Sequence, residues 1–234
     1  MQNPIIAALD VSSGAAAVDL VKQLAPVVGA FKIGSELFTL AGPDIVRQIR
    51  QTGAAVFLDL KFHDIPNTVA RAVTAAAQLD VQMLTVHTSG GTAMLKAAEE
   101  AAQQSAQKLN RPPPLVLGVT VLTSLDSNEL SEIGMQANVG HQVEKLAGVA
   151  AHAGLRGLVC SPLEITALRA FLPKEMQLVT PGIRAAGDKA DDQKRTLSAK
   201  EALAAGANWI VIGRPLHAAE NPRAAAEKIL STLQ

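Results

Sequence analysis

The sequence predicts a closed (βα)8 barrel, the TIM barrel, built as a single domain over residues 1–234. Two observations predict it: eight short apolar runs recur along the chain, and Ala-rich segments with helical spacing lie between them. Runs this continuous are typical of strands buried on both faces, as in parallel sheets. Eight strand-then-helix units in 234 residues fit a sheet that closes on itself.

We assign the eight strands to the apolar runs at residues 5–10, 30–34, 56–61, 83–89, 115–122, 157–161, 177–183 and 209–216. The clearest helical segments between them are 67–80, 91–109 and 139–154. The RPPP sequence at 111–114 must end its helix, because proline cannot continue one. Residues 122–140 do not repeat the pattern and are expected to be an insertion before the helix that follows the fifth run.

An open, doubly wound sheet is the alternative architecture for such a pattern. No GxGxxG sequence follows the first run, which weakens that alternative.

The composition excludes several kinds of partner. Lys+Arg and Asp+Glu number 21 each, so no basic field would attract nucleic acid or an anionic membrane. Only 3% of the residues are aromatic and there is no Tyr, so base-stacking platforms are not expected. No apolar run approaches the roughly 18 residues that a membrane helix needs.

The only cysteine, Cys160, lies in the apolar run GLVCS and is expected to be a reduced core residue. A cytoplasmic location fits this cysteine usage. The N-terminal sequence MQNPIIAALD has no basic region before its apolar residues, so we do not expect a signal peptide.

Polar residues gather where the predicted strands end. This is the edge at which barrels of this class carry their active sites. Helix capping alone would not explain a charged residue after nearly every apolar run. The residues concerned are Asp10, Lys32, Asp59, Lys61, His87, Thr123, Ser124, Ser161, Arg184, Gly213 and Arg214.

The stretch FLDLKFHDIP carries the densest charge. Asp59 and Lys61 are two apart, so on a regular strand they share a face, and we expect them inside the barrel with Lys32 as a partner. Together with Asp64 they form an alternating, neutral set of ions that could stay charged in a partly dry pocket. A buried ion-pair network that merely sets the register of the strands is the other interpretation.

The rigid turn IPNT favours a functional interpretation. It holds Asp64 on a loop at the mouth, where a purely structural pair has no reason to be. Asn67 or Thr68 is the expected N-cap of the following helix.

The last two runs carry a predicted phosphate site. Loops after strands seven and eight bind phosphate in many barrels. Gly213 would expose backbone N–H groups near a helix start, and Arg184 or Arg214 could hold phosphate oxygens, although either arginine alone could form a surface salt bridge. The polar segment 184–195 could fold over a ligand as a lid.

Three further residues have open interpretations. Asp10 could accept hydrogen bonds from sugar hydroxyls or cap a helix. His87 is expected to be a structural histidine rather than an acid or base, and His63 to pack outside the pocket. No cluster of His, Cys, Asp and Glu has metal-ligand spacing, and no nucleophile elbow is present.

These segments together resemble the orotidine 5′-phosphate decarboxylases of the bacterial type. The similarity lies in DLKFHDIP, preceded by ALD and FKIG and followed by LTS, VTPGIR and IGRPL, and it extends along essentially the whole chain. It implies a barrel that dimerises with the two mouths facing and converts orotidine 5′-monophosphate to UMP and CO2, the last step of de novo pyrimidine synthesis. It implies no metal and no organic cofactor.

The resemblance also implies roles for individual residues. Lys61 would protonate C6 of the pyrimidine, Asp59 would lie near the departing CO2, and Lys32 would orient Asp59 and touch the ribose. Asp64 and Thr68 would enter the pocket of the neighbouring subunit. The other implied ligands are Asp10 for the ribose, Thr123 or its rival Ser124 for the base, and Arg184, Gln193, Gly213 and Arg214 for the phosphate.

Two other functions remain open from the sequence. One is a metal-dependent sugar-phosphate decarboxylase, aldolase or epimerase of similar barrel type, and the other is a non-catalytic barrel that binds a phosphate ligand.

Overall fold

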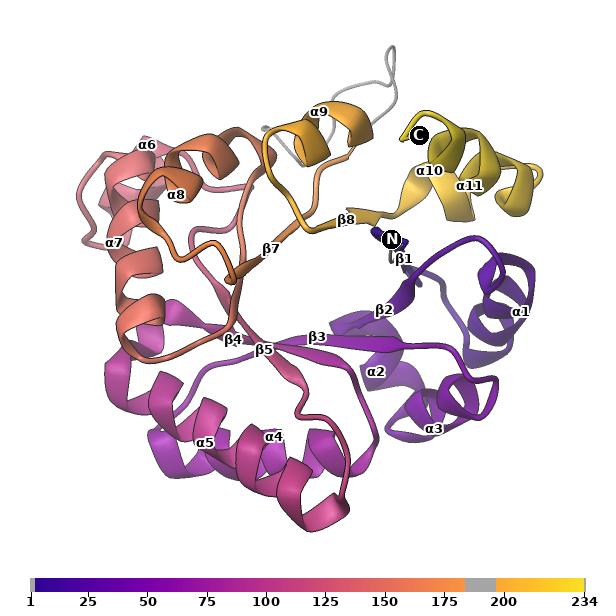
Figure 1. Cartoon of the computed structure of the whole chain (residues 1–234), viewed down its shortest axis with the longest axis horizontal. Coiled ribbons are helices and arrows are strands. Elements are labelled where there is room, and N and C mark those ends of the chain that lie inside the picture. The colour runs from indigo at the N-terminus through magenta and orange to yellow at the C-terminus, as the bar shows by residue number, and fades with distance from the viewer. Residues whose placement is uncertain (1–2, 184–196, 234) are drawn as a thin grey trace.

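The structure, a computed structural model, describes residues 3–183 and 197–233. Its strands form a closed barrel in the order β1 to β8, with every neighbouring pair parallel (Figure 1). The ring closes where Ile5 of β1 (Ile5–Ala8) pairs with Ile210 of β8 (Trp209–Ile212). The predicted barrel is therefore confirmed, and the open sheet is excluded because the first and last strands are hydrogen-bonded to each other.

The remaining strands are β2 (Ala30–Gly34), β3 (Val56–Phe62), β4 (Met83–His87), β5 (Leu115–Val119), β6 (Gly157–Val159) and β7 (Gln177–Thr180). The helices are α1 (Gly14–Leu24), α2 (Ser35–Ala41), α3 (Asp44–Gln51), α4 (Pro66–Gln78), α5 (Gly91–Leu109), α6 (Ser127–Glu132), α7 (Val139–His152), α8 (Ile165–Phe171), α9 (Ala199–Ala204), α10 (Arg214–His217) and α11 (Pro222–Ser231). Two short 3₁₀ helices occupy Thr88–Gly90 and Pro162–Glu164.

All eight predicted runs contain a strand, but several runs extend beyond it. The run at 115–122 contributes only Leu115–Val119, and the run at 209–216 contributes only Trp209–Ile212. The extra residues lie at the carboxyl edge of the barrel, most of them in loops and 214–216 in α10. Leu9 and Val121 are buried there without belonging to a strand. Apolar character thus marks burial in these segments rather than sheet pairing.

Alternating residues of each strand face two separate cores. In β1, Ile6 and Ala8 pack in the barrel interior with Phe57 and Trp209. Ile5 and its alternate neighbours belong instead to the large cluster between strands and helices. Since Leu58 packs in this outer cluster and Leu60 packs against it, the period-2 pattern turns Asp59 toward the interior.

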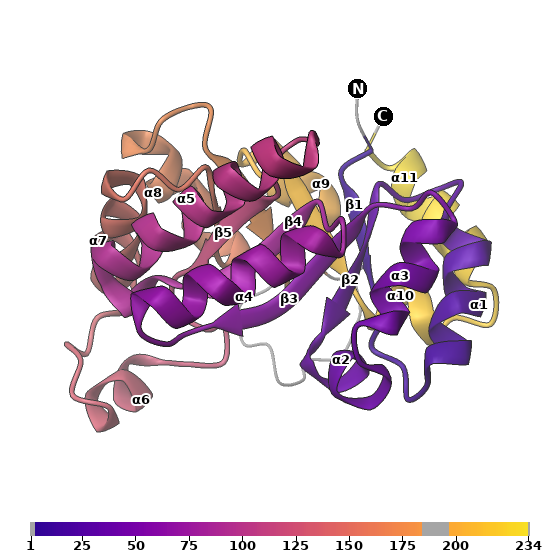
Figure 2. The ribbon, with the colours of Figure 1, turned by 90° about the horizontal axis from the view of Figure 1, so that it is seen from below.

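The connection after β5 carries an insertion at the carboxyl edge of the barrel. Figure 2 shows α2 and α6 on the side of the molecule where the strands end. The predicted insertion at 122–140 contains α6, whose start is fixed by a capping box between Asp126 and Glu129. In the described part of the chain no helix combines the length and the apolar character needed to cross a membrane.

Candidate active site

Four ions of alternating sign form a chain at the carboxyl edge of β1, β2 and β3. Lys32 Nζ lies 3.2 Å from Asp10 Oδ1 and 3.8 Å from Asp59 Oδ2. Lys61 Nζ lies 2.9 Å from Asp59 Oδ1. The side chains of Lys32 and Asp59 are each 14% exposed, whereas that of Lys61 is 35% exposed. The two inner ions therefore hold the outer lysine in place at the open end of the barrel, and the set has no net charge.

One member of the predicted set, Asp64, lies outside the ion chain that the described residues of one subunit form. Asp64 takes no part in an ion pair with any described residue, and its exposed carboxylate accepts a hydrogen bond of 2.6 Å from the N–H of Ile65. Asp10 joins the ion chain at its other end, beside Lys32, whereas Asp64 was predicted beyond Lys61. The expected turn is present, but α4 begins at Pro66 with Ile65 as its N-cap, so neither Asn67 nor Thr68 caps it. Proline suits the first helical position because its missing N–H would have had no helical partner there.

Lys61 lies in an irregular stretch of β3. From Leu58 to Phe62 β3 advances four residues, while β4 advances two, from Leu84 to Val86. Within this bulge Lys61 has φ of 51°, a left-handed conformation that costs a non-glycine residue about 1–3 kcal/mol. Strain of this kind persists only where neighbouring groups hold the backbone in place.

Thr85 of β4 is the neighbour that contacts this strained residue, and the sequence analysis did not identify it. Its Oγ1 accepts a hydrogen bond of 2.8 Å from the Lys61 N–H and donates one of 3.0 Å to Asp59 Oδ1. The residue is fully buried. The sequence did not mark this residue: only the β3–β4 register of the structure, extended by one residue beyond Leu58 and Leu84, places its side chain beside Asp59.

Asp10 connects the ion chain to the end of β8. An added Cβ on Gly213 would lie 3.3 Å from Asp10 Oδ2, so the absence of a side chain at 213 leaves room for this carboxylate. Asp10 does not cap α1, whose N-cap is Ser13, so the capping interpretation is wrong. Its contact with Lys32 places it at the same edge as the other ions.

The predicted phosphate residues are partly described. Gly213 is the N-cap of α10, as the expected helix start requires, and Arg214 is exposed at its first position. Arg184 and Gln193, with the whole of the predicted lid at 184–195, lie outside the described residues.

Both candidates for the base ligand lie in the turn that follows β5, where Thr123 is half-buried and Ser124 is exposed. Thr68 is exposed in the first turn of α4.

Two histidines pack against each other beside Lys61. The ring centroids of His63 and His87 are 5.5 Å apart with the planes tilted by 48°. Burial lowers the pKa of His87, and the neighbouring His63 and Lys61 charges lower it further, whereas Asp59 opposes the shift. His87 is thus favoured in its neutral form next to the ammonium group.

Cys160 is 1% exposed, as expected of a core cysteine. Among residues 3–183 and 197–233, no group of three or more His, Cys, Asp or Glu side chains is placed to hold a metal ion.

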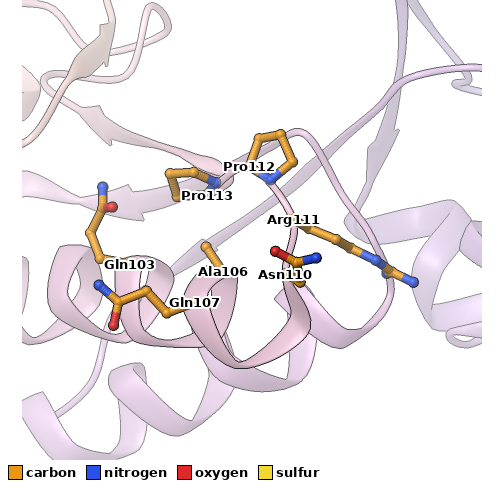
Figure 3. Close-up of a pocket in the computed structure, with 7 residues that line it drawn as sticks. All are labelled: Gln103, Ala106, Gln107, Asn110, Arg111, Pro112 and Pro113. Atoms are coloured by element: carbon orange, nitrogen blue, oxygen red, sulfur yellow. The ribbon is translucent and has the colours of Figure 1, made fainter.

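A shallow pocket of about 290 Å³ lies at the other edge of the barrel, where α5 ends and the chain leads into β5 (Figure 3). Arg111 is the one charged residue of its lining, and its guanidinium lies 3.5 Å from Asp80. The pocket offers amides and proline rings but no acid or base, so it is a poor candidate for catalysis. Its lining residues are Gln103, Ala106, Gln107, Asn110, Arg111, Pro112 and Pro113.

The ion chain can hold a cation against developing negative charge. Fixed ions in a partly dry site act more strongly than mobile ones in water, because little reorganisation is needed during the reaction. With Asp59 beside it, the Lys61 ammonium can both attract an anion and give it a proton.

Comparison with known proteins agrees with this chemistry. Residues 3–229 match the model of the orotidine 5′-phosphate decarboxylase / HUMPS family. The chain is 50% identical to orotidine 5′-phosphate decarboxylase of Moorella thermoacetica over 234 residues, which cover 100% of this chain and 93% of that protein. It is also 50% identical to the Opitutus terrae protein of the same name, over 98% of each chain. The crystal structure of orotidine 5′-phosphate decarboxylase from Lactobacillus acidophilus is similar with a TM-score of 0.88 and 36% identity, over 99% of both chains.

Proposed function

The chain belongs to the orotidine 5′-phosphate decarboxylase / HUMPS family, and on that premise we propose that it converts orotidine 5′-monophosphate to UMP and CO2 with Lys61 as the proton donor. The observation that carries the proposal is the ammonium group of Lys61, fixed 2.9 Å from Asp59 at the open end of the barrel. This conversion completes the synthesis of the pyrimidine nucleotide UMP.

The reaction needs a cation at one carbon atom. The bond between C6 and the carboxylate breaks, CO2 leaves, and the electron pair of that bond stays on C6 in the plane of the ring. No π system accepts this pair, so stabilisation must be electrostatic or must come from a proton. Lys61 supplies both: its charge attracts the pair, and its proton forms the new C6–H bond of UMP. The neutral amine then takes a proton from water.

Asp59 has two roles in this proposal. Its carboxylate holds the Lys61 ammonium group in place through the 2.9 Å ion pair. It also lies beside the substrate carboxylate, a contact between like charges that is relieved when CO2 departs. Lys32 offsets part of the negative charge at this point, since it contacts both Asp59 and Asp10.

The remaining residues bind the parts of the substrate that do not react. We assign the ribose to Asp10 and Lys32, and the base to Thr123 with Ser124 as the alternative. The phosphate is assigned to Gly213 and Arg214 with Arg184 and Gln193. Binding energy from the phosphate can close the lid at 184–195 and order the ions around the reacting carbon.

A homodimer completes the proposed site. Asp64, Ile65 and Thr68 are all exposed, and Ile65 keeps 66% of its surface exposed, which is unusual for a large apolar residue next to a functional cluster. We propose that two mouths face each other and that Asp64 and Thr68 enter the partner's pocket. A cytoplasmic location belongs to the same proposal.

One assay tests the function. The absorbance of orotidine 5′-monophosphate is followed with purified protein, with and without EDTA. Loss of substrate that is unaffected by EDTA is expected. Turnover abolished by EDTA would support a metal-dependent lyase instead. Binding of UMP without any substrate loss would indicate a non-catalytic barrel.

A further inference from the structure

We propose that Thr85 is a positioning residue for the decarboxylation, and that its hydroxyl group sets the geometry of both Lys61 and Asp59. The inference rests on the roles proposed for those two residues. It starts from the bulge in β3, where Lys61 adopts a left-handed conformation next to β4.

The hydroxyl of Thr85 connects the backbone of Lys61 to the carboxylate of Asp59. The Lys61 N–H donates a hydrogen bond of 2.8 Å to Oγ1 of Thr85, so the hydroxyl oxygen acts as the acceptor. The single hydroxyl hydrogen is then donated to Asp59 Oδ1 at 3.0 Å. One buried group therefore fixes where the lysine leaves the strand and where its counter-ion lies.

The polarity of this connection matters for the chemistry. Because the hydroxyl hydrogen is directed at Asp59 Oδ1, that oxygen must act as an acceptor, which suits an ionised carboxylate. The same oxygen accepts from Lys61 Nζ at 2.9 Å, while Oδ2 faces Lys32 at 3.8 Å. The carboxylate is held from three sides, and Thr85 is the one uncharged partner among them.

Removing the hydroxyl should therefore move the ammonium group without removing it. Valine at 85 has nearly the same shape but cannot accept the Lys61 N–H or donate to Asp59. A displacement of about 1 Å at a reacting group costs on the order of 10²-fold in rate. We expect kcat of Thr85→Val to fall about 10- to 100-fold while KM and the Kd for UMP stay close to the parent values, since the residues assigned to ribose and phosphate are elsewhere.

Two variants separate this effect from general loss of packing. Thr85→Ser keeps the hydroxyl and should restore kcat to within about fivefold of the parent. Thr88→Val is the matched control: Thr88 is also buried, and its hydroxyl donates to the carbonyl of Val119 at 2.7 Å, away from the ion chain. It should lose thermal stability comparably but keep kcat.

The outcomes are distinguishable from failure of the proposed function. If Lys61→Ala is inactive but Thr85→Val keeps kcat within about threefold of the parent, the positioning role is wrong and the function stands. If Lys61→Ala keeps a near-normal kcat, the proposed mechanism itself is wrong. Equal losses of kcat in Thr85→Val and Thr88→Val would show a merely structural effect and overturn the inference.

If Thr85→Val does not fold, a comparison of Thr85→Ser with Thr85→Cys still tests the inference. Thr85→Ser and Thr85→Cys differ only in a hydroxyl against a thiol, which is a weak donor and a weak acceptor. A kcat for Thr85→Cys about tenfold or more below that of Thr85→Ser supports the positioning role, and equal kcat values contradict it.

Discussion

The ammonium group of Lys61 lies 2.9 Å from Oδ1 of Asp59, and the backbone of Lys61 itself departs from the regular strand conformation. On a regular strand, two side chains of the same face point in parallel from positions about 6–7 Å apart. The bulge turns the lysine back toward the carboxylate and places both groups at the mouth of the barrel. Strain in the backbone is thus coupled to the ion pair on which the proposed chemistry depends.

A side chain at position 213 should weaken substrate binding. The Cβ of Gly213→Ala would approach Asp10 Oδ2 to 3.3 Å, so the carboxylate must shift by a few tenths of an ångström. We expect KM for orotidine 5′-monophosphate to rise about tenfold, because Asp10 and Gly213 are both assigned to substrate binding. Steady-state kinetics check this.

Gly148→Ala is the matched control for that variant. Gly148 lies within α7, and an added Cβ there meets no atom within 4 Å. The control should keep KM and gain about 0.5–1 kcal/mol in helix stability. Equal KM values for the two variants would exclude crowding at Asp10.

His87 should make the folded state sensitive to acid. Burial, His63 and Lys61 lower the pKa of its imidazole in the folded protein, so the unfolded chain takes up a proton first as the pH falls below 6.5. The unfolded state then binds more protons than the native state, and the free energy of unfolding decreases with falling pH. We expect His87→Gln to lose less stability between pH 7 and pH 5 than the parent, in urea denaturation at both pH values.

The exposed His152 of α7 provides the comparison. His152→Gln makes the same exchange at an exposed position and is measured at the same two pH values. If His87→Gln depends on pH as the parent does, protonation of His87 does not control acid stability.

Mixing two inactive variants should restore activity. If Asp64 is shared across the dimer, a hybrid of Lys61→Ala and Asp64→Ala chains has one complete site and one doubly defective site. Random exchange at equal amounts makes half of the dimers hybrids, so about one quarter of the parent activity should return. Activity is measured after co-refolding, with hybrids counted by native mass spectrometry. Proven hybrids without activity would contradict sharing of Asp64.

The barrel was predictable because its strands are buried on both faces and appear as continuous apolar runs. Period-2 spacing also placed Asp59 and Lys61 together, and the need for a partner charge pointed to Lys32 on the neighbouring strand. The true length of β5 and β8 was less predictable, since loop residues such as Val121 are buried as completely as strand residues.

The sequence was less informative about tertiary choices within the site. Spacing predicted Asp64 in the ion chain, but the turn before Pro66 directs it outward, and Asp10 comes from a strand end 22 residues before Lys32. The bulge in β3 leaves no mark in the sequence, and without it the role of Thr85 cannot be recognised. Such features depend on contacts between strands rather than on local propensity.

The central claim is that the Lys61 ammonium protonates C6 and stabilises the charge that develops there. The most direct test measures kcat and the Kd for UMP of Lys61→Ala beside Lys22→Ala, which removes an exposed lysine of α1. We expect Lys61→Ala to lose at least about 10⁴-fold in kcat while still binding UMP measurably, because both proton and charge are lost, and Lys22→Ala to match the parent. A kcat of Lys61→Ala within about tenfold of the parent would contradict the account.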